Sequence, residues 1–213
     1  MLECPNPNSV RIATCPGALA YPFLGVLARQ REAEPETQPR LIETGITDQI
    51  EGLAAGRYDI GLSLEPPMDA PVASVPMWRD EVAVALPKNH PLLAQEDIAL
   101  DEIARHPLVL WCPRRCESLS AQVNTLLHVA RRPLNVTQWA VSFDTLAMMV
   151  ASGFGLALAA KSRIVDFQKA GILMRPLAGA PHYLTTYLLH PVVAHSDVGE
   201  RFVERARTLS LDA

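Results

Sequence analysis

The feature that most constrains this chain is a regular alternation of short apolar runs with amphipathic helical patterns. The apolar run Val10–Thr14 precedes a helical pattern that includes Phe23 and Val26, and comparable pairs of segments continue along most of the 213 residues. Short apolar runs bounded by turn residues are typical of buried strands. A strand–helix–strand order is typical of parallel strands joined by right-handed crossovers. The sequence therefore predicts an α/β fold with mixed, mainly parallel sheets.

The first part of the chain carries four predicted strands, with helices between the first three. The second of these helices has Asp48 and Glu51 at the spacing of a capping box, and it is expected to end at Gly56. Prolines are frequent from Pro66 to Pro76, and we expect this passage to separate two strands without being a flexible linker. The predicted strands lie at 10–14, 40–43, 60–64 and 81–86.

The second part of the chain repeats the alternation. Leu53–Gly56 and Val150–Gly153 are similar helix ends, each followed by an apolar strand. This echo fits two alike α/β lobes, but helix ends commonly have the same pattern, so both interpretations stay open. Trp111 and Trp139 are expected in the core. Further strands are predicted at 108–111, 136–141, 155–159, 172–175 and 183–189, and helices at 118–130, 144–152 and from Val198 to Leu209.

The composition excludes several classes of protein. Hydrophobic residues make up 49% of the chain and the net charge is −4, which argues against intrinsic disorder and against binding to a nucleic-acid backbone. No apolar stretch approaches the roughly 20 residues of a membrane span, and residues 1–9 lack an apolar signal region. We therefore expect a cytoplasmic protein with no membrane partner.

Cysteine and histidine usage predicts no metal site. Cytoplasmic cysteines are normally reduced, so a disulfide framework is not expected. Cys112 and Cys116 have no second pair of ligands to complete a zinc site, and the six histidines do not cluster near them. We predict neither a metal nor a cofactor.

Several segments carry a resemblance to a known family. They are the strand at Val10–Thr14, the segment Ile50–Leu62 with its Gly-Arg-Tyr-Asp turn, the segment Trp78–Leu92, and the helix–glycine–strand passage Val150–Ala160. Together they make the chain similar to the effector-binding domain of LysR-type transcriptional regulators, which has the type 2 periplasmic-binding-protein fold. The resemblance covers about residues 9–210.

The resemblance implies two Rossmann-like lobes around an interlobe cleft. Lobe I would be discontinuous, at 1–79 and 182–213, and lobe II would be 80–181. The family's N-terminal DNA-binding winged helix-turn-helix is absent from this sequence, which implies either an excised fragment or a stand-alone pair of lobes. DNA would then be contacted only through that absent domain.

The resemblance also implies a homodimer of sensing domains, and a tetramer in the full-length protein. The paired surfaces would be the helix face at Phe23–Gln30 and the helix at Ser118–Ala130. Effector binding would close the lobes and rearrange the oligomer, which requires that the effector bind one state more tightly than the other.

Ligands of parallel α/β sheets bind beyond the carboxyl ends of the strands, where loops and helix N-termini converge. Five loops meet this criterion, and the family binds small effectors at the matching positions. Backbone N–H groups at helix starts, together with the guanidinium groups of Arg114 and Arg115, suit a carboxylate or another small anion. The candidate effector contacts are Thr14, Cys15, Pro16, Thr44, Gly45, Leu64, Glu65, Pro113, Arg114, Arg115, Ser118, Ser142 and Phe143.

Each candidate also has an ordinary structural interpretation. Thr14 and Ser142 have the chemistry of helix N-caps, and Cys15 is small enough to be a packing residue. Phe143 could stack on an effector ring or pack under its loop. Glu65 would favour effectors with an amine or hydroxyl, but it also fits a solvated loop acid. Thr44 and Gly45 could likewise only shape a turn, and Pro16 could be a rigid loop residue. Arg114 and Arg115 could form an exposed basic loop that contacts no effector.

Three other functions compete with sensing. A thiol enzyme would use Cys15 at a predicted helix N-terminus, but no histidine lies in the candidate loops, so no catalytic residue is predicted. A redox sensor would join Cys112 and Cys116 in a disulfide, against the alternative of two unreactive thiols. An exported solute-binding protein shares the fold but needs a signal peptide.

Overall fold

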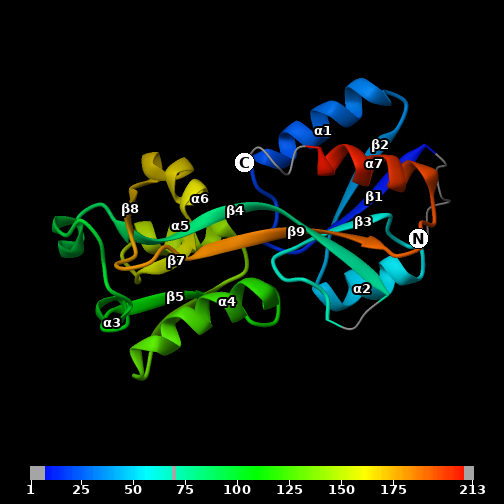
Figure 1. Ribbon diagram of the computed structural model, residues 1–213. Coiled ribbons are helices and arrows are strands. Elements are labelled where there is room, and N and C mark those ends of the chain that lie inside the picture. The colour runs from blue at the N-terminus through cyan, green and yellow to red at the C-terminus, as the bar shows by residue number, and fades with distance from the viewer. Residues whose placement is uncertain (1–7, 69–70, 209–213) are drawn as a thin grey trace. The chain divides into compact units, whose positions relative to one another are not determined.

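The computed structural model describes residues 8–68 and 71–208, and its chain divides into two compact units. Unit 1 contains the chain up to Trp78 and from Thr185 onward, and unit 2 is Arg79–Leu184. Strands β4 (Val72–Pro87) and β9 (Tyr183–Pro191) both run from one unit into the other (Figure 1).

Unit 1 is built on a mixed sheet with the strand order β2-β1-β3-β9. Strand β1 (Ser9–Thr14) pairs in parallel with β2 (Gln38–Glu43) and with β3 (Ile60–Ser63), whereas β9 is antiparallel to β3. The parallel arrangement predicted for the first three strands is therefore confirmed. It brings the carboxyl ends of β1, β2 and β3 to one edge of the sheet.

Helices cover both faces of this sheet. Figure 1 shows α1 (Pro22–Ala33) and α7 (Asp197–Arg207) on one side and α2 (Ile46–Ala54) on the other. Pro22 starts α1 at a position where its missing N–H costs nothing. The Ser196 hydroxyl caps α7 by accepting from the Gly199 N–H at 3.1 Å.

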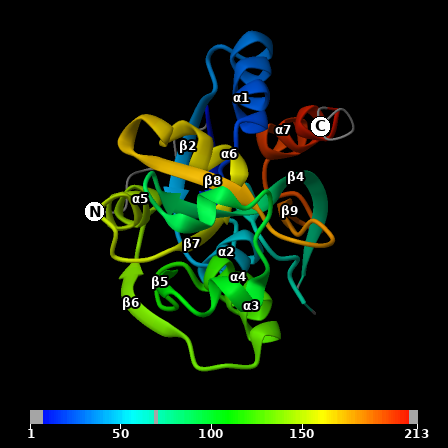
Figure 2. The same ribbon diagram turned by 90° about the vertical axis from the view of Figure 1, so that its left-hand side faces the viewer.

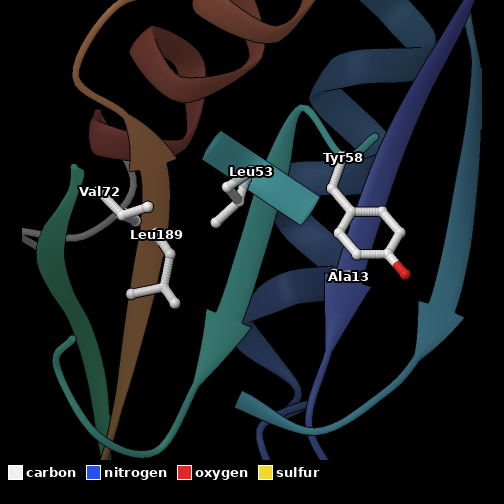
Figure 3. Packing of buried hydrophobic residues seen from close by; sticks show 5 residues of the cluster. All are labelled: Ala13, Leu53, Tyr58, Val72 and Leu189. Carbon is white, nitrogen blue, oxygen red and sulfur yellow. The ribbon is translucent and has the colours of Figure 1, made fainter. Parts of the chain in front are cut away.

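The core between α2 and the sheet is mainly apolar. Ala13, Leu53, Tyr58, Val72 and Leu189 form a buried cluster that draws on four elements and the turn after α2 (Figure 3). The side chain of Leu53 is fully buried, and burial of a leucine stabilises a fold by roughly 2 kcal/mol. This packing fixes α2, and with it the loop that precedes the helix.

Unit 2 contains two groups of strands. The second half of β4 pairs antiparallel with β7 (Ala157–Ala160) and β8 (Ile172–Pro176), and β5 (Pro107–Trp111) pairs in parallel with β6 (Asn135–Ala140). Figure 2 shows α4 beside β5, and both α4 and α5 pack on the β5–β6 pair. The helices of unit 2 are α3 (Leu100–Ile103), α4 (Glu117–Leu127), α5 (Phe143–Ala151) and α6 (Lys161–Asp166), with short 3-10 turns at Pro91–Ala94, His128–Ala130 and Gln168–Ala170.

Two predictions about the first half of the chain were wrong. The predicted capping box does not form, because α2 begins at Ile46 after Gly45, and Asp48 lies inside the helix with other partners. The proline-rich passage does not wholly separate two strands, because β4 already begins at Val72 and includes Pro76. Pro76 is exposed, and an exposed strand position tolerates a residue without a backbone N–H.

Trp139 was also placed wrongly, since 48% of it is exposed, whereas Trp111 is buried as predicted. Between Leu108 and Val109 of β5 the pairing with β6 shifts by one residue, so Thr137 has no opposite residue. Such a bulge changes which side chains face the core. Leu209, predicted on the inner face of the last helix, lies outside the described residues.

Candidate functional site

Three of the five predicted loops converge within unit 1. The Thr44 N–H donates to the Thr14 carbonyl at 2.9 Å, and the Cys15 N–H donates to the Leu62 carbonyl at 3.0 Å. These bonds continue the strand pairing beyond Thr14 and hold the loops after β1, β2 and β3 together. We refer to these loops, 14–17, 44–47 and 64–67, as the unit 1 edge.

Asp48 tethers the unit 1 edge to the turn before β3. Its Oδ2 accepts from Thr44 Oγ1 at 2.9 Å and from the Tyr58 hydroxyl at 2.7 Å, while its Oδ1 accepts from Arg57 at 2.9 Å. The hydrogen bonds from Tyr58 and Arg57 lower the pKa of Asp48 below its ordinary value. The sequence prediction missed this role, because Arg57 and Tyr58 lie beyond the end of α2 and reach Asp48 only in the folded chain.

Gln49 was missed as well. It is fully buried on α2, and its Nε2 donates to the Leu62 carbonyl at 3.3 Å and toward the Thr44 carbonyl at 3.4 Å. The side chain thereby joins the loop after β2 to the end of β3. A polar residue on the inward face of an amphipathic helix was the available signal.

Thr14 and Cys15 lie at the unit 1 edge but not at a helix start. Helix α1 begins only at Pro22, so the predicted position of Cys15 at a helix N-terminus was wrong, and Thr14 caps no helix. Burial raises the pKa of the Cys15 thiol to about 11, so the thiol is protonated at neutral pH and unsuited to nucleophilic attack. The Thr14 hydroxyl donates to the Cys15 carbonyl at 3.3 Å.

The other candidates of unit 1 shape the same edge. Gly45 is the exposed N-cap of α2 and has no side chain with which to cap it. Pro16 and Glu65 are half-buried, and the Glu65 N–H donates to Ser63 Oγ at 3.2 Å. Leu64 is buried.

The remaining two loops converge within unit 2. The Cys112 N–H donates to the Ala140 carbonyl at 2.8 Å, and Cys116 Sγ lies 3.5 Å from the Val141 carbonyl. Helices α4 and α5 both begin here, and Ser142 caps α5 by accepting from the Thr145 N–H at 3.2 Å. The capping interpretation of Ser142 is thus confirmed. We refer to loops 111–118 and 142–144 as the unit 2 edge.

Arg114 and Arg115 are the cationic groups of the unit 2 edge. Both are exposed, as is Pro113, and within residues 8–68 and 71–208 neither guanidinium has a hydrogen-bond or ion-pair partner. Two exposed acids, Glu117 and Asp144, lie in the first turns of α4 and α5. Any preference of this edge for anions therefore depends on the two arginines as well as on the helix N–H groups. Ser118 is buried in the first turn of α4.

Phe143 packs beneath the unit 2 edge. Its ring lies 6.4 Å from Trp111 and 5.1 Å from Phe167, and the Arg163 guanidinium lies 5.2 Å over it. Trp111 is itself held by a hydrogen bond from Nε1 to the Leu158 carbonyl at 3.0 Å. These contacts favour the packing interpretation of Phe143 over stacking on an effector.

The two cysteines of unit 2 are free in the structure. No disulfide joins Cys112 and Cys116, and Cys116 is buried as the N-cap residue of α4. Among the described residues, no three histidine, cysteine, aspartate or glutamate side chains gather into a possible metal site. In the same part of the chain, no helix combines the length and apolar character that a bilayer crossing needs.

Comparison with known proteins places the chain in a family of regulators. The family model for the LysR substrate binding domain matches residues 6–209. The HTH-type transcriptional regulator AlsR of Bacillus subtilis (strain 168) is 26% identical over 148 residues, which are 68% of this chain and 49% of AlsR. The chain thus spans about half the length of the curated relatives it matches.

Solved structures show the same fold. The effector-binding domain of QuiR in complex with shikimate matches with a TM-score of 0.82 and 13% identity, over 95% of this chain and 96% of that one. The BenM effector-binding domain with its effector benzoate matches with a TM-score of 0.77 and 18% identity, over 94% and 91% of the two chains. The predicted α/β fold of the type 2 periplasmic-binding-protein class is confirmed.

Proposed function

Because the chain belongs to the LysR substrate-binding domain family, we propose that it senses a small anionic effector for a LysR-type transcriptional regulator. The family and the curated relatives are transcriptional regulators and not enzymes, in agreement with the prediction that the chain is not an enzyme. We further propose that units 1 and 2 act as lobes I and II, and that both edges contact the effector.

One observation carries the anionic character of the effector. Two helix N-termini meet at the unit 2 edge beside Arg114 and Arg115, whose guanidinium groups have no partner among the described residues. Guanidinium groups bind carboxylates in a two-pronged geometry, and helix N–H groups add donors. Shikimate and benzoate, the molecules bound by QuiR and BenM, are both carboxylates.

A thermal-shift screen of small metabolites tests this proposal. We expect a few carboxylates to raise the melting temperature, since a ligand that binds only the native state stabilises it. Arg114→Ala is expected to remove the shift without unfolding the protein, and Thr14→Ala to weaken it. A shift that survives in both variants would rule out this site.

The oligomer is proposed to form through apolar surfaces. On α1, Leu24 is 62% exposed, and on unit 2, Met148 of α5 and Phe154 are 63% and 52% exposed. The outward residues of α4 are mostly polar, so α5 and β6 are better supported than the predicted helix 118–130 as the surface of unit 2. We expect Leu24→Glu to reduce the mass measured by light scattering from that of a dimer to that of a monomer.

DNA binding is proposed to reside in another part of the full-length protein. AlsR is an HTH-type regulator about twice as long as the segment matched here, and the net charge of this chain is −4. In this role the effector shifts the equilibrium between arrangements of the oligomer, and a cytoplasmic location follows from it.

A further inference from the structure

We propose that unit 2 carries a second anion site, which is distinct from the two edges and binds a phosphate group. The site is a cavity of about 320 Å³ at the end of α4, and we refer to it as the α4 cavity. Its lining residues all come from one turn and are Leu127, His128, Arg131, Arg132, Pro133 and Leu134. This inference does not depend on the proposed function, since none of these residues belongs to either edge.

The α4 cavity lies at the opposite end of α4 from the unit 2 edge. Helix α4 begins in that edge at Glu117 and ends at Leu127, and the other lining residues lie between Leu127 and the start of β6 at Asn135. The 11 residues of α4 rise by about 16 Å. A small effector bound at the unit 2 edge therefore does not reach the α4 cavity.

The segment around the α4 cavity has an excess of positive charge. Residues 118–143 contain no aspartate or glutamate, although the net charge of the whole chain is −4. In the described part of the chain, neither Arg131 nor Arg132 has a hydrogen bond or an ion pair through its guanidinium. Both side chains are exposed, so they can bind an anion without breaking another bond.

The acidic side chains of a neighbouring helix are already paired. Helix α3 packs against the 3-10 turn His128–Ala130 and carries Asp101 and Glu102. Both carboxylates form ion pairs with Arg105, at 2.7 Å and 3.2 Å, and Glu102 also lies 3.5 Å from His106. Much of their charge is thus balanced at the end of α3, and the α4 cavity keeps its positive potential.

Arg131 has a backbone conformation that normally selects glycine. Its φ of 48° and ψ of 36° lie in the left-handed region, where Cβ comes close to the following carbonyl oxygen. Every other described residue with a positive φ is a glycine. The 3-10 turn at Gln168–Ala170, for example, ends in the same way at Gly171, which has a φ of 92°. Arg131 is therefore strained where glycine would not be, and a binding role for its guanidinium accounts for an arginine there.

The turn holds both arginines in fixed backbone positions. The Arg131 N–H donates to the His128 carbonyl at 3.1 Å, which closes the 3-10 turn. Arg132 precedes Pro133, and the proline ring restricts it to extended backbone. Neither arginine has to order its backbone when an anion binds, which lowers the entropic cost of the complex.

His128 adds a third polar group whose tautomer is fixed. Its Nδ1 lies 2.6 Å from the Asn124 carbonyl, and because a carbonyl only accepts, Nδ1 carries the proton and donates. Nε2 is then an acceptor in the neutral ring and becomes a donor when the ring is protonated. It can bond a phosphate oxygen in either state, with the proton on the phosphate in the first case and on the ring in the second.

A phosphate group fits this set of side chains better than a carboxylate does. Guanidinium groups bind both anions in a two-pronged geometry, but a phosphate monoester has three terminal oxygens and a charge of about −1.5 to −2. Two arginines and an imidazole match the three oxygens, and the two unpaired cations match the charge. Leu127 and Leu134 add an apolar wall, and about 320 Å³ lies at the lower end of the range of ligand cavities. The expected ligand is inorganic phosphate or the phosphate monoester of a small molecule.

Amide NMR of the whole chain, titrated with inorganic phosphate and with phenyl phosphate, tests the inference. Both probes should perturb backbone amides within 127–134. A lower dissociation constant for phenyl phosphate would identify a phosphate monoester as the ligand, and equal constants would identify free phosphate. Added NaCl should weaken the binding of both probes, because exposed charges are screened by salt.

Arg131→Gly separates binding from stability, because its two expected effects have opposite signs. The affinity for both phosphates should fall about tenfold, since a charge-assisted hydrogen bond is lost. The midpoint of urea unfolding should stay the same or rise, since glycine relieves the strain of the left-handed backbone. Arg132→Gln should lower the affinity by a similar factor and leave the midpoint unchanged.

Two matched controls locate the loss of affinity. Arg31→Gln removes another exposed arginine from the last turn of a helix, α1, and should leave the affinity for both phosphates unchanged. Arg114→Ala/Arg115→Ala removes the cations of the unit 2 edge and should leave the perturbations within 127–134 in place.

The outcomes distinguish this inference from the proposed function. The inference is wrong if neither phosphate perturbs 127–134, if the perturbations survive unchanged in Arg131→Gly, or if both arginine variants of the α4 cavity lose stability together with affinity. Perturbations confined to 111–118 and 142–144 that disappear in Arg114→Ala/Arg115→Ala would place the phosphate at the unit 2 edge. That result would overturn the inference and support the proposed function.

Discussion

The two candidate edges differ in how far their polar groups are already bonded. At the unit 1 edge, the hydroxyls of Thr14 and Thr44 and the carboxylate of Asp48 are all engaged in hydrogen bonds. At the unit 2 edge, Arg114 and Arg115 are exposed and have no bonding partner in the described part of the chain. Side chains that are already hydrogen-bonded hold their loops in a fixed geometry. Cations without a partner can bind an anion without first breaking another bond. The unit 1 edge is thus held by its own hydrogen bonds, whereas the unit 2 edge carries the cations that we propose for effector binding.

The largest loss of stability is expected from the removal of Asp59, a buried carboxylate of unit 1 that forms an ion pair with Arg11. Asp59 accepts from the Arg11 N–H at 2.8 Å and from its guanidinium at 3.0 Å, and from Ser196 Oγ at 2.7 Å, with its side chain 2% exposed. Burial alone would raise the pKa of Asp59, but the bonds from Arg11 and Ser196 outweigh it and lower the pKa. Asp59→Ala should cost roughly 3 kcal/mol in urea unfolding.

The control for Asp59 is an exposed pair. Asp101 and Arg105 are 53% and 56% exposed, so Asp101→Ala should change the free energy of unfolding by less than about 1 kcal/mol. Equal losses of unfolding free energy in Asp59→Ala and Asp101→Ala would show that the buried bonds of Asp59 add no more stability than an exposed pair does.

Replacement of Arg114 and Arg115 in unit 2 should leave stability unchanged and lower the affinity for a carboxylate. Their replacement in Arg114→Ala/Arg115→Ala removes no bond from the described structure, so the free energy of unfolding should stay within about 0.5 kcal/mol of wild type. Affinity for a carboxylate found in the screen should fall by about 2 kcal/mol, because a charge-assisted bond is lost. A variant that unfolds more easily would show that these groups are structural, and the contrast between the edges would fail.

A smaller effect is expected from the Ser142 capping bond at the unit 2 edge. Ser142→Ala removes the bond to the Thr145 N–H and should cost about 1 kcal/mol of stability. Ser142→Gly should cost only a few tenths, roughly 0.3 kcal/mol, because glycine is tolerated as an N-cap. If alanine and glycine are equivalent in thermal unfolding, the cap does not hold α5 in place.

The smallest effect is expected on the pH dependence of unfolding, through Glu34, which is hydrogen-bonded to Arg201 and Arg205 of α7. The hydrogen bond from Arg201, followed by that from Arg205, lowers the pKa of Glu34 from 4.5 to about 2. A carboxylate with a depressed pKa stabilises the fold above its unfolded pKa and loses this contribution as pH falls toward 2. Urea unfolding at several pH values below 4.5 should therefore show a steeper loss in wild type than in Glu34→Gln. Glu32→Gln, at an exposed position of α1, should keep the wild-type slope.

The strands and their parallel order could be predicted because they follow from hydrophobic periodicity. A short run rich in apolar and β-branched residues, as in Val10–Thr14, is typical of a buried strand. Which face of its strand a side chain lies on was harder to predict. Trp139 follows a bulge at Thr137, and a single unpaired residue reverses the alternation of a strand without any mark in the sequence.

The candidate loops could be predicted from strand order, but not the bonds within them. Thr14 and Thr44 were identified because they follow strands whose carboxyl ends meet. Asp48 was interpreted from local spacing as part of a capping box, whereas its bonds to Thr44, Arg57 and Tyr58 depend on how α2 packs on β3. Cys15 was expected at a helix N-terminus, but α1 starts only at Pro22.

The central claim is that a small anion binds at the two edges, and amide NMR of the titrated chain tests it most directly. A carboxylate from the thermal-shift screen should perturb backbone amides at 14–17, 44–47 and 64–67 of unit 1 and at 111–118 and 142–144 of unit 2. The perturbations in unit 2 should disappear in Arg114→Ala/Arg115→Ala. Perturbations confined to other segments, or unchanged in that variant, would contradict the account.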